Sequence, residues 1–125
     1  MERDAVIAAG FGFREGAGVE SLADALQAAR AGGPAPEVIA TLPAKAGHDA
    51  LRALADRLAL PLRAVAPDGR PTLTTSPAAL AAHGTGSVAE AAALAAAGPG
   101  ARLIGPRAIS SDRMATCAIA VGETL

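Results

Sequence analysis

Residues 84–94 read GTGSVAEAAAL and predict the start of a helix that packs on a sheet. Ser87 stands at the N-cap position, and Glu90 follows three residues later, as in the S-x-x-E capping box that begins many helices. The alanine-rich run continues to Ala97, and the sequence 98-GPG-100 ends it. The capping role accounts for Ser87 and Glu90, so neither residue needs a catalytic role.

On both sides of this helix, short apolar runs bounded by Gly and Pro alternate with helical patterns, which is typical of βαβ units. Only nine residues, 106–114, separate the last two strands, too few for a crossover helix, so we expect these strands to be antiparallel neighbours. Ser21 and Asp24 resemble a capping box for the first helix. We predict strands at 4–9, 37–42, 61–66, 102–105 and 115–121, and helices at 21–31, 48–59, 76–83 and 88–97.

The expected fold is therefore a single α/β domain over residues 1–125. It has three layers, α/β/α, around a mixed, mostly parallel five-stranded sheet with an antiparallel C-terminal strand.

Composition excludes several classes of protein. With 11 basic and 12 acidic residues the net charge is −1, so no overall positive field attracts nucleic acid or an anionic membrane. Cys117 is the only cysteine, which rules out an intrachain disulfide and a cysteine metal cluster. No secretory signal, membrane span, carboxylate pair or metal-ligand set is recognisable. We predict a cytoplasmic protein with no metal, no cofactor, and neither nucleic acid nor membrane as partner.

Basic residues follow the predicted strands at their carboxyl ends, where open α/β sheets bind ligands. Arg14 follows the first strand, Lys45 the second and Arg70 the third, and Arg107 and Arg113 follow the fourth. If the alanine-rich helix runs antiparallel to these strands, its N-terminus lies at the same edge and adds its dipole. The sequence thus predicts a site for anionic groups.

Two further features bear on this site. Lys45 is the only lysine, and it is either a donor to a carboxylate or phosphate or a solvated surface residue. In the first loop, Glu15 stands where G-x-G-x-x-G requires its third glycine, so Gly12 and its neighbours favour close backbone approach to a bound group, or a tight surface loop. Phe13 belongs either to the core or to the apolar wall of a pocket.

Four segments resemble the CobE family, which is also the C-terminal domain of CbiG proteins of cobalamin biosynthesis. They are 10-GFGFREG-16, Thr41 with Lys45, 84-GTGSVAEAAAL-94 and 115-ATCAIAV-121, and the similarity extends over nearly the whole chain. The family has a cysteine where this chain has Phe13, and a second basic residue where it has Glu15. The chain begins at its own Met1, which resembles the stand-alone CobE form rather than a fusion.

The resemblance implies a precorrin or corrin intermediate as ligand, bound by a carrier or pathway helper that also has other pathway enzymes as possible partners. An alternative is a hydrolase or isomerase of the same macrocycle using His83, Ser87 or Lys45, and another is an adaptor for a pathway enzyme. No catalytic residue is identified. The expected ligand-binding residues are Gly12, Arg14, Lys45, Gly84, Thr85, Gly86, Ser87 and Arg107, with the backbone amides from Thr85 to Val88 facing the ligand.

Overall fold

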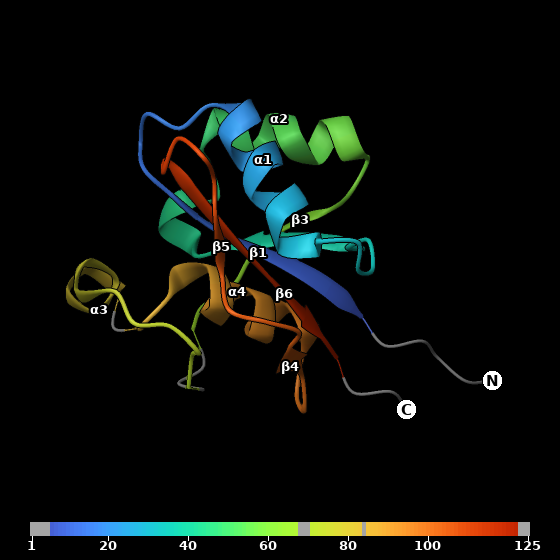
Figure 1. Cartoon of the computed structure of the whole chain (residues 1–125), viewed down its shortest axis with the longest axis vertical. Coiled ribbons are helices and arrows are strands. Elements are labelled where there is room, and N and C mark those ends of the chain that lie inside the picture. The colour runs from blue at the N-terminus through green and yellow to red at the C-terminus, as the bar shows by residue number, and fades with distance from the viewer. Residues whose placement is uncertain (1–5, 68–70, 84, 123–125) are drawn as a thin grey trace.

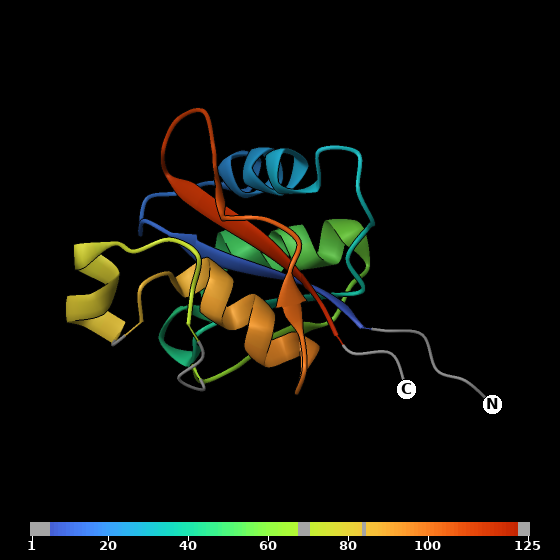
Figure 2. The same cartoon turned by 60° about the horizontal axis from the view of Figure 1, so that its bottom comes forward.

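The computed structural model describes residues 6–67, 71–83 and 85–122. Helices α1 and α2 cover one face of the central sheet and α4 covers the other, while α3 stands at one end (Figures 1 and 2). The expected three-layer α/β/α arrangement is confirmed. The elements are β1 (Ile7–Phe13), α1 (Val19–Arg30), β2 (Val38–Thr41), the short 3-10 helix η1 (Pro43–Lys45), α2 (Asp49–Leu58), β3 (Leu62–Ala64), α3 (Pro77–His83), α4 (Val88–Ala97), β4 (Arg102–Leu103), β5 (Ala108–Ile109) and β6 (Ala115–Val121).

The strands lie in the order β3-β2-β1-β6-β4, and β5 also pairs with β6. Strands β1, β2 and β3 are parallel, whereas β6 runs antiparallel to β1, β4 and β5. Every strand other than β6 therefore points the same way, as predicted for a mostly parallel sheet with an antiparallel C-terminal strand. The sheet has six strands rather than the expected five, because β5 forms within residues 106–114. With two residues it is too short to show any hydropathy period.

Strand β1 continues to Phe13, so Gly10 and Gly12 lie within it and not in the loop that we expected from residue 10 onward. A Cβ atom on Gly10 would lie 2.1 Å from the carbonyl oxygen of Ala89 and 2.4 Å from the backbone nitrogen of Ala93. Gly10 therefore allows the backbone of α4 to lie directly on the sheet. At this position the close approach serves a helix of the chain itself.

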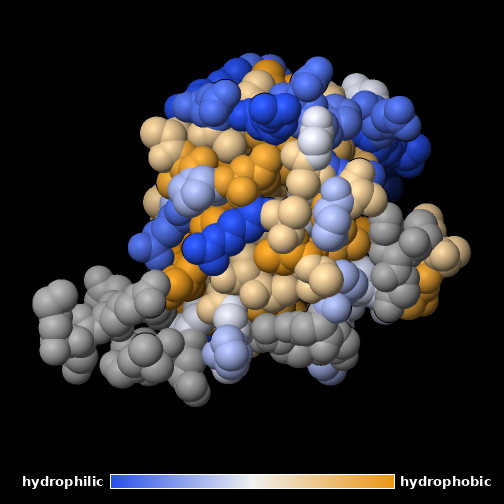
Figure 3. Space-filling view, turned by 180° about the vertical axis from the view of Figure 1, so that it is seen from behind, coloured by the Kyte–Doolittle hydropathy of each residue, from blue (hydrophilic) through white to orange (hydrophobic). Residues whose placement is uncertain are grey.

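The core has two unlike halves. Large side chains fill the space between the sheet and helices α1 and α2, among them Phe11, Leu22, Ile39, Leu51 and Ile119. The α4 side is built largely of alanine, including Ala8, Ala40, Ala92, Ala93 and Ala120. Small side chains let α4 pack closely, and most of its residues are buried. The outer surface of the α1 and α2 layer, at the top of Figure 3, is mainly hydrophilic.

Helix α1 begins after Gly18, two residues earlier than predicted, so Ser21 and Asp24 do not form a capping box. Instead the Ser21 hydroxyl donates to the carboxylate of Asp112. Asp24 accepts hydrogen bonds from the backbone nitrogen and the hydroxyl of Ser111, at 2.7 and 2.9 Å. Both side chains thus connect α1 to the turn before β6. Among the described residues, no helix is long and apolar enough to cross a membrane.

Candidate functional site

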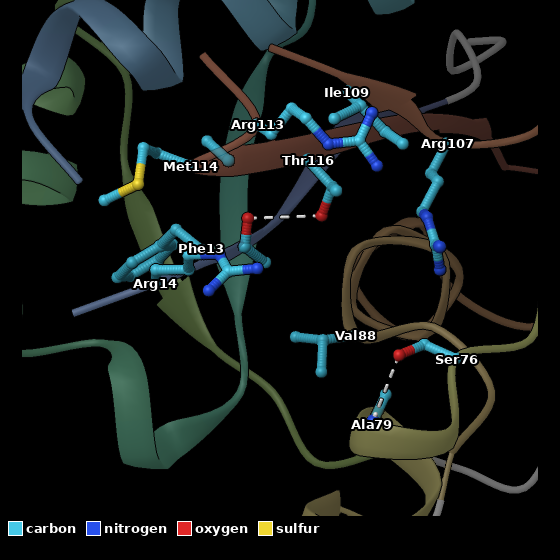
Figure 4. Close-up of a pocket in the computed structure, with 12 residues that line it drawn as sticks. Phe13, Arg14, Ser76, Ala79, Val88, Arg107, Ile109, Arg113, Met114 and Thr116 are labelled. Atoms are coloured by element: carbon cyan, nitrogen blue, oxygen red, sulfur yellow. Dashed lines mark hydrogen bonds between the residues drawn. The ribbon is translucent and has the colours of Figure 1, made fainter. Parts of the chain in front are cut away.

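A pocket of about 230 Å³ opens where the carboxyl end of β1 meets the start of β6. Its walls also include β5 and the first turns of α3 and α4 (Figure 4). We call it the arginine pocket, since three arginines line it together with apolar and small polar residues. The lining residues are Gly12, Phe13, Arg14, Ser76, Ala79, Val88, Arg107, Ile109, Arg113, Met114, Ala115 and Thr116.

The three arginines come from separate segments: Arg14 follows β1, Arg107 precedes β5, and Arg113 belongs to the turn before β6. Figure 4 shows their side chains on different sides of the cavity. The one ion pair among the described residues joins Arg57 to Glu20, so none of the three has a carboxylate partner there. Such unpaired charges in a concave site attract anions. The Nε atom of Arg107 is also buried without a hydrogen-bond partner.

Local hydrogen bonds position two of these arginines. The backbone nitrogen of Arg14 donates to the carbonyl oxygen of Met114 at 2.9 Å, which joins the end of β1 to the start of β6. Arg113 has a φ of 63°, in the left-handed region, and its backbone nitrogen donates to Ser110 O at 2.9 Å. Hydrogen bonds from Ser110, Ser21 and the Met114 backbone lower the pKa of Asp112 in the same turn.

Glu90 has a different role from the one predicted. The Ser87 hydroxyl accepts from the backbone nitrogen of Glu90 at 3.2 Å, so the predicted N-cap is confirmed. The carboxylate of Glu90, however, does not complete a capping box. It accepts from the backbone nitrogen of Thr74 at 2.9 Å and from that of Arg107 at 2.8 Å. Glu90 thereby contacts two segments that the capping pattern does not involve.

A second pocket of about 290 Å³ lies beside Phe13, which lines both pockets. Its Lys45 ammonium donates to the carbonyl oxygen of Phe13 at 2.8 Å and lies 5.0 Å from the centre of that ring. His48 caps α2 by accepting from the backbone nitrogen of Ala50 at Nδ1, so its Nε2 donates to the carbonyl oxygen of Glu15 at 2.7 Å. These bonds hold the chain after β1 in place.

The structure brings together three of the residues expected to bind a ligand, because Gly12, Arg14 and Arg107 all line the arginine pocket. Lys45 lines the second pocket instead. The remaining expected residues belong to the connection between α3 and α4. Gly84 lies outside the described residues.

In that connection, Thr85 and Ser87 are buried. Gly86 packs against the chain itself: its carbonyl oxygen accepts from the backbone nitrogen of Ser76 at 2.7 Å, and a Cβ atom there would lie 2.6 Å from the hydroxyl of Thr72. These contacts within the chain explain why residue 86 is a glycine, and no bound ligand is needed to account for it. The side chain of His83 lies outside the described part of the structure.

The expected ligand-binding residues did not include Arg113 or Met114, although the sequence placed Arg113 among the basic residues at the ligand-binding edge. Both precede β6, whose antiparallel pairing with β1 places Ala115 opposite Phe13. The start of one strand therefore lies beside the carboxyl end of the other. The predicted antiparallel C-terminal strand contained the signal, since antiparallel pairing with β1 would place these residues at the ligand-binding edge.

Comparison with known proteins identifies the family. Residues 7–120 match the family model described as cobalamin synthesis G C-terminus. The chain is 32% identical to the solved structure of CobE, a protein from the cobalamin (vitamin B12) biosynthetic pathway, with a TM-score of 0.84 over 100% of this chain and 96% of that chain. It is 38% identical to the cobalamin biosynthesis protein chiG of Agrobacterium tumefaciens, with a TM-score of 0.72 over 94% of this chain and 99% of that chain. No curated protein matches. The chain therefore belongs to the cobalamin synthesis G C-terminus family, as its sequence motifs suggested.

Proposed function

We propose that this protein binds a precorrin or corrin intermediate of cobalamin biosynthesis in the arginine pocket, as a carrier or pathway helper. The observation that carries the proposal is the convergence of Arg14, Arg107 and Arg113 on one cavity, with no carboxylate partner among the described residues. Membership of a cobalamin family supplies the class of ligand.

The chemistry of the ligand matches the pocket. Corrin precursors have apolar faces and a ring of carboxylate side arms. Guanidinium groups bind carboxylates with two parallel hydrogen bonds, which gives both affinity and orientation. The side chains of Phe13, Ile109 and Met114 offer an apolar surface beside the arginines. The pocket thus combines cations and apolar contacts in the way that such a ligand requires.

The size of the pocket determines how much of the ligand enters. Its volume of about 230 Å³ is below the roughly 300–1,000 Å³ of sites that enclose a drug-sized ligand. We therefore propose that carboxylate arms enter the pocket and that the ring lies across its mouth. Ile109, which is 43% exposed, offers apolar surface there.

The contacts of the candidate catalytic residues favour binding over turnover. The Ser87 side chain is buried and accepts the capping hydrogen bond of α4. The Lys45 ammonium donates to a backbone carbonyl. A nucleophile needs an adjacent base to activate it, whereas both of these side chains are engaged in structural hydrogen bonds. A carrier needs no such group.

Isothermal titration of the purified protein with hydrogenobyrinic acid tests the proposal. We expect saturable binding that weakens with added salt. Arg107 is partly buried, so Arg107→Gln should weaken binding about tenfold, as for loss of one charge-assisted hydrogen bond. Arg14 is exposed, and Arg14→Gln should weaken it only about two- to fivefold.

Arg52→Gln is the matched control, because Arg52 is an exposed arginine on α2 away from the pocket. It should bind the ligand as the wild type does. Absence of any heat or spectral change at high micromolar ligand would refute the proposal. An equal loss of affinity in the control and the pocket variants would also contradict it, since binding would then follow net charge alone.

A further inference from the structure

We infer that Glu90 is a positioning residue of the arginine pocket, whose carboxylate holds two segments of the pocket wall in register with each other. The inference rests on the proposed function and adds to it a residue that touches no ligand. Glu90 belongs to the first turn of α4 and is completely buried. It lies outside the set of residues that line the pocket.

The hydrogen bonds of Glu90 explain how a carboxylate can be buried there. A buried charge is costly unless hydrogen bonds replace its hydration. One carboxylate oxygen accepts from Thr74 N and the other from Arg107 N, at 2.9 and 2.8 Å. The N-terminal dipole of α4 also favours a negative charge in this turn. Each oxygen of the Glu90 carboxylate thus has a backbone donor from elsewhere in the chain.

Both donors belong to irregular segments next to the pocket. Thr74 shortly precedes Ser76, which lines the pocket and caps α3 by accepting from the backbone nitrogen of Ala79 at 3.3 Å. Arg107 lines the pocket with its own side chain. A single carboxylate therefore links the α3 side of the pocket to the Arg107 side. Neither segment can move away without breaking a charge-assisted hydrogen bond.

Two substitutions in the same helical turn separate this role from a general effect on stability. In Glu90→Gln the side chain keeps its size, but only one of its two terminal atoms can accept a hydrogen bond. The other becomes an NH2 donor that points at a backbone N–H, and two donors cannot bond to each other. At least one of the two segments then loses its anchor. In Ser87→Ala the helix loses its N-cap, while the carboxylate of Glu90 and its two bonds remain. Ser87→Ala is therefore the matched control for destabilisation of α4.

Amide hydrogen exchange measured by NMR tests the anchor without any ligand. In the wild type, the amides of Thr74 and Arg107 should be protected although neither is in a helix or strand. Glu90→Gln should speed exchange of at least one of them by about tenfold or more, and Ser87→Ala should leave both within about twofold. The inference would be overturned if the wild-type amides of Thr74 and Arg107 exchanged as fast as exposed loop amides. This measurement uses the wild type alone, so it does not depend on whether a variant folds.

Titration with hydrogenobyrinic acid then tests the effect on binding. We expect Glu90→Gln to weaken binding about tenfold and Ser87→Ala to leave it within about twofold. If Glu90→Gln bound the ligand as tightly as the wild type does, the positioning role would be overturned. Equal losses of affinity in Glu90→Gln and Ser87→Ala would also overturn it, because they would show a general effect of α4 stability. Failure of the wild type to bind would refute the proposed function, and the exchange measurement would still decide whether Glu90 anchors the two segments.

Discussion

Replacement of Gly10 by alanine should be one of the most destabilising single substitutions in this chain. The new Cβ atom would lie 2.1 Å from Ala89 O and 2.4 Å from Ala93 N, both backbone atoms of α4. Ordinary van der Waals contact begins near 3.4 Å, so the helix would have to move outward by about 1.3 Å. No side-chain rotation relieves a clash with backbone.

Overpacking a core typically costs about 1–3 kcal/mol, and contact with backbone places this case at the upper end. We therefore expect Gly10→Ala to lower the free energy of unfolding by about 3 kcal/mol, measured by urea denaturation followed by circular dichroism. The midpoint of thermal unfolding should fall by roughly 10 °C. Such a loss is a large fraction of the total stability of a small domain.

Gly47→Ala is the matched control, because a Cβ atom on Gly47 would meet nothing within 4 Å and its φ is not positive. It should be neutral or stabilise the protein by up to about 1 kcal/mol, through reduced entropy of the unfolded chain. If Gly10→Ala were as stable as the wild type to within about 0.5 kcal/mol, α4 would not lie as close to β1 as described, and the explanation for its alanine-rich sequence would be wrong.

Two further predictions concern ionisable groups. Burial raises the pKa of the Cys117 thiol well above its usual range. The native protein should therefore resist alkylation at pH 8 and react only after unfolding. Rapid labelling of Cys117 in native buffer would contradict its burial. The pKa of Asp112 is lowered in the folded state, so its contribution to stability is complete above the unfolded pKa of about 3.9 and is lost as the pH falls through the folded value. Asp112→Asn should flatten the fall in stability between about pH 5 and pH 2, measured by urea denaturation at each pH, and an unchanged pH profile would show that these hydrogen bonds do not form in solution.

Local patterns were sufficient for most of the fold. The cap at Ser87 and the strand at 115–121 are confirmed at the predicted positions, because each rests on neighbours in sequence. The predicted end of the first strand at residue 9 was wrong, because glycine is a poor strand former. Only the tertiary packing of α4 explains why Gly10 and Gly12 lie within β1. Strand β5, which pairs with β6 across a short hairpin, was missed because its two residues are too few to show a hydropathy period.

The candidate site was predictable to the extent that topology alone determines it. Arg14 and Arg107 each follow a strand of the same direction in the sheet, and they do share a pocket. Lys45 follows a neighbouring strand, but its bond to Phe13 O turns it to the other side of that residue. The role of Glu90 was hidden, because S-x-x-E gives the same sequence whether the carboxylate caps its own helix or accepts from distant backbone.

A structure of the protein crystallised with hydrogenobyrinic acid would show directly where the macrocycle binds. We expect carboxylate arms of the ligand paired with Arg107 and with at least one of Arg14 and Arg113, and the ring across the mouth of the pocket beside Ile109. A ligand bound on another surface, with all three guanidinium groups left free, would contradict this expectation.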